Sequence, residues 1–126
     1  MDILWRGPAS PPLAKQEPLA KIFAETTVLR GSWSDTKATY VGLKGGTTTK
    51  GREHSHLDLG SFVLDAIGQR WAVELGPPKD YTECYLQPPE RYQFYRASTL
   101  GHNTLVVNGG NQKVPAAAKF GTLRER

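Results

Sequence analysis

The chain has 126 residues, which is enough for one domain with a core and too few for two ordinary ones. With 38% hydrophobic and 22% charged residues it has a soluble globular composition, and its 13 glycines and 9 prolines favour short segments joined by turns. The net charge of +4 gives a mild attraction to polyanions, but the basic residues are scattered, which argues against nucleic acid. The lone Cys84 excludes an intrachain disulfide and a multi-cysteine metal site, and no apolar run approaches the ~18 residues of a membrane span.

Residues 1–20 are expected to form a proline-rich linker or arm, and residues 21–126 a single domain. Residues 1–18 hold four of the nine prolines and show no periodic apolar pattern. They also lack the cationic start and apolar stretch of a signal peptide. If the parent protein is exported, we expect its signal to lie upstream.

Short alternating runs within residues 21–126 predict β-strands. The runs are rich in Val, Thr and aromatic residues and are bounded by Gly, Asp or Lys. Two of them flank Ile67-Gly68-Gln69 at a spacing typical of a hairpin. The expected strands are residues 23–30, 38–43, 62–66, 70–75 and 104–108, with a further one near 119–120.

This pattern indicates an all-β fold, an antiparallel β-sandwich or barrel, with almost no helical period. Five or six strands are fewer than the seven or more of a usual two-sheet sandwich, so we expect a partial sandwich. The exposed edges of such a sheet could pair with the edges of a second copy of the chain.

The histidines His54, His56 and His102 are the strongest chemical signal. On a strand, residues i and i+2 share a face, so the first two imidazoles would project together. Glu74 ends the following hairpin, and two imidazoles with one carboxylate make a typical zinc site. A solvated histidine face, or a hydrogen-bond network with Asp58, would explain the same spacing.

Four ordered motifs carry a resemblance to a known family. They are His-x-His-x-Asp at 54–58, Gly-Ser-Phe at 60–62, Trp-x-x-Glu-Leu-Gly at 71–76 and Gly-His-Asn-Thr at 101–104. From about residue 29 to residue 112 the chain resembles the C-terminal β-sandwich domain of heparinase II/III-like polysaccharide lyases. This domain follows a helical toroid in lyases that act on heparin, heparan sulfate or alginate.

The resemblance implies a structural zinc bound by His56, Glu74 and His102. The family usually has Asp where this chain has Glu74. His54 would point into the substrate cleft, and Asn103 and Thr104 would orient His102 through hydrogen bonds.

The resemblance also implies β-elimination on uronic-acid-containing glycans, with one functional tyrosine between the carboxylate and the last histidine. The candidates are Tyr81, Tyr85, Tyr92 and Tyr95, and Tyr85 is preferred. Arg91 and Arg96 are expected to bind substrate carboxylates or sulfates, and Arg70 and Arg52 are further candidates. Because family members draw their remaining catalytic groups from the toroid, we expect the chain alone to be inactive.

Two alternatives stay open at this point. A non-catalytic carbohydrate-binding β-sandwich would use the tyrosines and arginines as a sugar platform. A cupin-like metal protein would place Glu three or four residues after the second His, where this chain has Leu59 and Gly60. The lyase interpretation places the parent protein in the periplasm or outside the cell.

Overall fold

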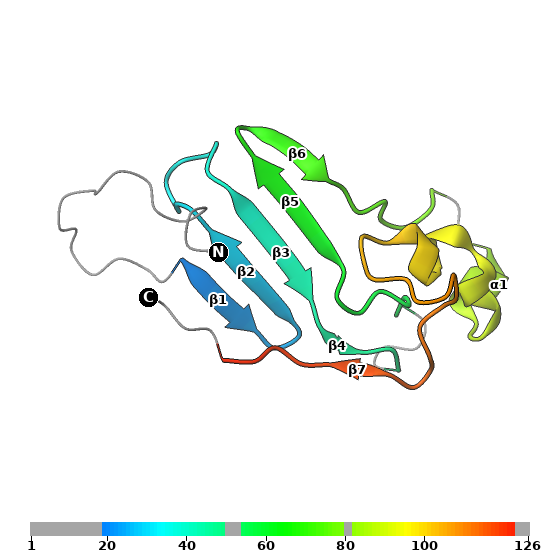
Figure 1. The fold of residues 1–126 in the computed structure, drawn as a ribbon. Coiled ribbons are helices and arrows are strands. Elements are labelled where there is room, and N and C mark those ends of the chain that lie inside the picture. Colours follow the sequence, from blue (N-terminus) through cyan, green and yellow to red (C-terminus); the bar gives the residue numbers. More distant parts are fainter. Residues whose placement is uncertain (1–18, 50–53, 80–81, 123–126) are drawn as a thin grey trace.

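The strands of the chain form two antiparallel sheets (Figure 1). The computed structural model describes residues 19–49, 54–79 and 82–122. The larger sheet has the order β1-β2-β3-β5-β6, and the smaller one pairs β4 with β7. The strands are β1 Ala20–Phe23, β2 Thr26–Arg30, β3 Tyr40–Lys44, β4 Gly46–Thr47, β5 Phe62–Ala66, β6 Gln69–Ala72 and β7 Ala117–Ala118.

In the described part of the chain, helical structure is confined to four short turns between β6 and β7. They are α1 Glu83–Leu86, η2 Glu90–Gln93, η3 Tyr95–Ala97 and η4 Thr99–Gly101. The predicted all-β antiparallel class is therefore confirmed. No helix among the described residues is long and apolar enough to cross a membrane.

The predicted strand over residues 23–30 is wrong in one respect, because a turn divides it. β1 and β2 are antiparallel neighbours, with Phe23 opposite Thr26. Ala24 has a φ of 40° and makes the reversal, although neither Ala24 nor Glu25 is a usual turn residue. The predicted arm over 1–20 lies outside the described residues up to residue 18, and Ala20 already belongs to β1.

The hairpin predicted around residues 67–69 is confirmed as β5 and β6. Ile67 and Gly68 have φ values of 56° and 72°, as a two-residue type I′ turn requires. β6 ends at Ala72, earlier than expected, and a register shift lies between Leu64 and Asp65.

The strand predicted over residues 104–108 is not formed. Only an isolated bridge joins Val107 to Gly110 across the Asn108-Gly109 turn. Leu105 and Val107 are 78% and 64% exposed, because no neighbouring strand pairs with this segment. The last predicted strand is present slightly earlier in the chain, as β7.

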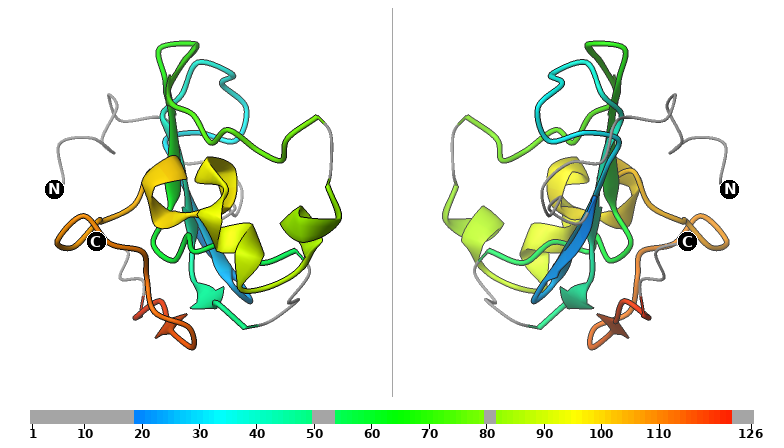
Figure 2. Two further views of the ribbon diagram at one scale, coloured as in Figure 1. Left: turned by 90° about the vertical axis from the view of Figure 1, so that its right-hand side faces the viewer. Right: turned by 90° about the vertical axis from the view of Figure 1, so that its left-hand side faces the viewer.

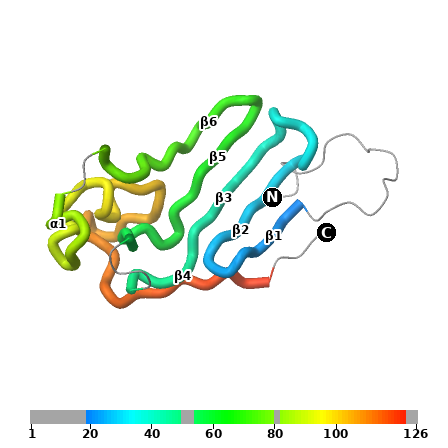
Figure 3. Tube along the Cα trace, turned by 180° about the vertical axis from the view of Figure 1, so that it is seen from behind, coloured from blue at the N-terminus to red at the C-terminus, as the bar shows by residue number. Residues whose placement is uncertain are grey.

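The two faces of the larger sheet differ in chemistry. Paired positions place Leu29, Val41 and Leu64 on one face, and Arg30, Tyr40 and Asp65 on the other. The loop of residues 31–39 and α1 lie on one side of the sheet, and the segment around 105–112 on the other (Figure 2). The buried apolar side chains all come from residues outside the strands: Leu57, Leu59, Tyr85 and Ala97. Figure 3 shows the segments that carry them, the loop before β5 and the helical turns, at one end of the larger sheet.

Candidate metal centre

In the loop of residues 54–61, His56 and Asp58 alternate with the buried Leu57 and Leu59. The backbone N–H of Leu57 donates to the carbonyl of Ala97 at 3.0 Å, and that of Leu59 to Oε1 of Gln112 at 2.9 Å. His56 is half-buried and Asp58 is buried, and neither lies in a strand. The strand predicted for this pair is wrong, and His54 lies exposed outside the cluster.

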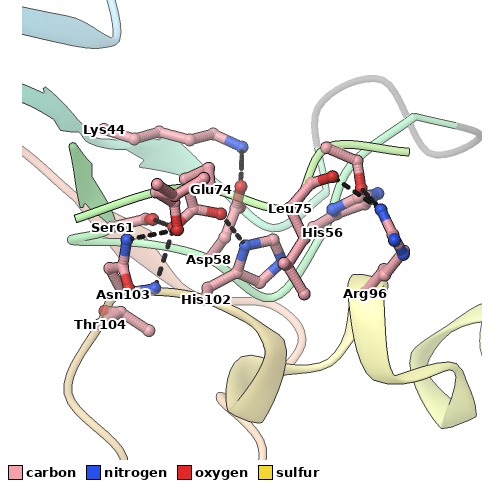
Figure 4. A network of polar contacts seen from close by, with 12 residues as sticks. Lys44, His56, Asp58, Ser61, Glu74, Leu75, Arg96, His102, Asn103 and Thr104 are labelled. Atoms are coloured by element: carbon pink, nitrogen blue, oxygen red, sulfur yellow. Dashed lines mark hydrogen bonds and ion pairs between the residues drawn. The ribbon is translucent and has the colours of Figure 1, made fainter. Parts of the chain in front are cut away.

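His102 reaches the same place from the end of η4. A Cβ on Gly101 would collide with the carbonyl oxygen of Tyr95, so only glycine permits this tight approach to η3. The rings of His56 and His102 lie with their centroids 5.2 Å apart. One ligand atom from each of His56, Asp58 and His102 lies within 4.8 Å of the others (Figure 4).

Glu74 binds the other nitrogen of His102. Its Oε2 lies 2.6 Å from Nδ1 of His102, and its Oε1 accepts from the hydroxyl of Ser61 and, at 2.9 Å, from the N–H of Asn103. Burial opposes ionisation of Glu74 and is the largest single influence on it. The hydrogen bonds from Ser61, Asn103 and His102 together outweigh burial and lower the pKa of Glu74.

The remaining nitrogen of His102, Nε2, is buried and has no hydrogen-bond partner among the described residues. A carboxylate at Nδ1 holds the proton there and leaves the lone pair on Nε2, which suits a metal ligand. Leaving a buried polar atom unpaired is costly, so its presence here favours a ligand function.

Asp58 is held by Lys44 at the end of β3. Nζ of Lys44 donates to both carboxylate oxygens of Asp58, at 2.7 and 2.6 Å. The Lys44 backbone also bonds Gly60 and Ser61, which fixes the loop against the sheet. The carboxylate is 11% exposed and therefore mostly withdrawn from water.

His56 is a neutral side chain near pH 7. Desolvation by burial is the main cause, with His102 second, and the pKa of His56 falls to about 4. Its Nε2 lies 2.9 Å from the hydroxyl of Tyr85, which is buried. Arg91 lies against the Tyr85 ring at 5.3 Å from its centroid, and Phe94 contacts it edge-on.

The other predicted tyrosines lie elsewhere. The Tyr92 hydroxyl lies 3.5 Å from that of Ser55, and Tyr95 is 61% exposed. Tyr81 falls outside the described residues, as does Arg52.

The predicted substrate-binding arginines are engaged within the chain. Arg91 is 1% exposed, and Nη1 of Arg96 donates to the backbone carbonyls of Leu75, Gly76 and Pro77. Arg70 is paired with Asp65. Substrate contact by Arg91 stays a prediction that would require its side chain to leave a buried position.

Asn103 and Thr104 bond the surroundings of His102. Nδ2 of Asn103 donates to the carbonyls of Phe62 and Val73, and the Thr104 hydroxyl donates to that of Leu59. These contacts tie η4 to β5 and to the loop of residues 54–61, and thereby place His102 opposite His56.

Comparison with known proteins shows the family of the chain. No curated protein matches the chain in a sequence search. The family model described as heparinase II/III-like, C-terminal matches residues 27–124, which is most of the chain. The chain therefore belongs to the heparinase II/III-like C-terminal domain family.

Proposed function

We propose that the chain is the zinc-binding β-sandwich portion of a polysaccharide lyase that acts by β-elimination on uronic-acid-containing glycans. Membership of its family supports a function related to polysaccharide lyases. Two observations carry the metal part: one ligand atom from each of His56, Asp58 and His102 lies within 4.8 Å of the others, and Nε2 of His102 is buried without a partner among the described residues. In the parent protein we place this domain beside a helical toroid, in the periplasm or outside the cell.

The donor set fits zinc. Two neutral imidazoles and one carboxylate are typical protein ligands of zinc, and they leave a fourth position for water or another group. We propose Asp58 as the carboxylate ligand, because its oxygen lies within the 4.8 Å cluster. Glu74 would then orient His102 from its other nitrogen, and bound zinc would supply positive charge that fixes both rings.

Tyr85 is the residue we propose for proton transfer. In β-elimination a base removes the C5 proton of the uronate, the electron pair forms the C4–C5 double bond, and the C4–O bond breaks. The leaving oxygen then takes a proton from an acid. The Tyr85 hydroxyl lies next to Nε2 of His56. As a phenolate Tyr85 would accept the first proton, and as a phenol it would give the second.

His54 is a second candidate of different character. It is exposed and lies two residues before His56, so it is accessible to a glycan. Its proposed role is to neutralise the uronate carboxylate or to shuttle a proton. The chain alone would lack the neutralising groups that we expect from the toroid, so we propose that it binds zinc without turning over substrate.

Metal content tests this proposal. The chain is dialysed against zinc and then buffer, and zinc per protein is measured by elemental mass spectrometry. We expect near one zinc in the wild type and its loss in His56→Ala and His102→Ala. His54→Ala is the matched control, because it removes an exposed imidazole two residues away and should retain zinc. A wild type without zinc, or equal loss in all three variants, would overturn the metal assignment.

A further inference from the structure

A second cluster lies at the opposite end of β3 from the metal centre. Arg30, the last residue of β2, lies opposite Tyr40, the first residue of β3. Its guanidinium carbon is 5.0 Å from the ring centroid of Trp33 and 5.4 Å from that of Tyr40. Nζ of Lys21 lies 4.9 Å from the same Trp33 ring. These four residues are called the Arg30 cluster below.

The charge of Arg30 is not neutralised by a carboxylate in the described part of the chain. None of the ion pairs seen there includes Arg30, and its buried Nε has no hydrogen-bond partner. Arg70 on the same sheet face is different, because two of its nitrogens bond Asp65 at 2.6 and 2.8 Å. Two aromatic rings thus hold a half-buried guanidinium whose charge no described carboxylate neutralises.

The Arg30 cluster and the metal centre share one face of the sheet. The register places Arg30, Tyr40 and Lys44 on the same face, and Lys44 is the residue that holds Asp58. From Tyr40 to Lys44 the strand rises roughly 13 Å. Between them Gly42 has no side chain, and a Cβ there would lie 3.2 Å from the Tyr40 hydroxyl.

We propose that the Arg30 cluster is an anion-binding subsite for an acidic polysaccharide. It would bind the carboxylate or sulfate of a sugar unit beyond the one at the metal centre. This inference rests on the proposed function, because it takes the same glycan class as the lyase site. The planar guanidinium matches both anions geometrically. Because two rings already restrict its motion, the side chain loses less conformational entropy when it binds an anion.

Glycan binding by single-residue variants tests the subsite. Dissociation constants for alginate and heparin oligosaccharides are measured by calorimetry with the zinc-loaded chain. We expect Arg30→Gln to weaken binding about tenfold, the scale of one lost charge-assisted contact. Lys119→Gln is the control, because it removes a positive charge at an exposed position just after β7 and outside the Arg30 cluster. It should change binding less than about twofold.

A second variant separates the subsite from a purely structural role. Arg30→Lys keeps the positive charge but loses the planar guanidinium. We therefore expect its dissociation constant to lie between those of the wild type and Arg30→Gln. Thermal unfolding and zinc content are measured on each variant, and binding is compared only among variants that remain folded. Equal affinity of the wild type and both Arg30 variants would overturn the subsite and leave the proposed function intact. A wild type that binds zinc but no acidic glycan would overturn the subsite together with the proposed substrate class.

Discussion

Asp58 and Glu74 both lie near His102, and of these two carboxylates only Glu74 is hydrogen-bonded to its ring. Glu74 occupies Nδ1, whereas Nε2 is the atom without a partner. A metal at Nε2 would take Asp58 as its third ligand and leave Glu74 in place. The charge on Asp58 that Lys44 now balances would then be shared with the metal.

Substitutions at these two carboxylates should therefore weaken zinc binding unequally. We expect Asp58→Asn to remove most of the affinity, since it removes a ligand. Glu74→Gln should cost about 10- to 100-fold, as loss of a partner that orients a ligand typically does. Competition with a chromophoric chelator measures both. Normal affinity in Asp58→Asn together with no binding in Glu74→Gln would make Glu74 the ligand.

The lowered pKa of His56 predicts how stability depends on pH in the metal-free chain. Its pKa is about 4 when folded and 6.5 as an unperturbed side chain, so between these values the unfolded chain binds more protons. Stability contributed by neutral His56 is thus complete above pH 6.5 and is lost as pH falls toward 4. Denaturant unfolding at pH 4.5–6.5 should show a shallower decline for His56→Gln than for the wild type. Parallel declines would contradict the shift.

The sequence predicted part of this site. Spacing and motifs selected His56 and His102, and the structure brings these two rings together. Asp58 was seen only as a neighbour that could join a hydrogen-bond network. Lys44 is 14 residues from Asp58 and carried no local signal, because the contact exists only through the register of β3 with β2 and β5.

At the scale of elements, the β5–β6 turn contains a strained residue. Ile67 has a φ of 56°, so a β-branched residue adopts the left-handed region of backbone conformation. Its side chain is 79% exposed, so burial does not offset this strain. Asn is the residue that this turn position favours. We expect Ile67→Asn to raise the free energy of unfolding by about 1 kcal/mol. Leu105→Asn, at an exposed position without positive φ, should give no such gain in the same denaturant measurement.

The elements that the sequence predicted well have an explicit turn signal. Gly68 and the Asn108-Gly109 pair marked two turns that the structure contains. The turn at Ala24 was missed because Ala24 and Glu25 resemble the strand residues around them. The strand predicted over residues 104–108 has the alternating apolar pattern, but it is not formed. Such a pattern forms a strand only where another strand pairs with it.

At the scale of the molecule, the buried apolar residues and the candidate metal centre lie together beyond one end of the larger sheet. The buried apolar residues belong to the loop of residues 54–61 and to the helical turns, whereas Leu29, Val41 and Leu64 on the sheet are only partly buried. A metal joining His56 and Asp58 to His102 would connect that loop to η4, far apart in sequence. Bound zinc should therefore stabilise the fold, because it binds the folded chain and not the unfolded one.

X-ray absorption at the zinc edge of the zinc-loaded chain tests the central claim most directly. The proposed centre predicts a shell of nitrogen and oxygen ligands at about 2.0–2.2 Å, with the outer-shell signature of two imidazoles. In His102→Ala that signature should fall to one imidazole or zinc should be lost. A wild-type spectrum with no imidazole signature, or with a sulfur shell from Cys84, would contradict the proposed centre.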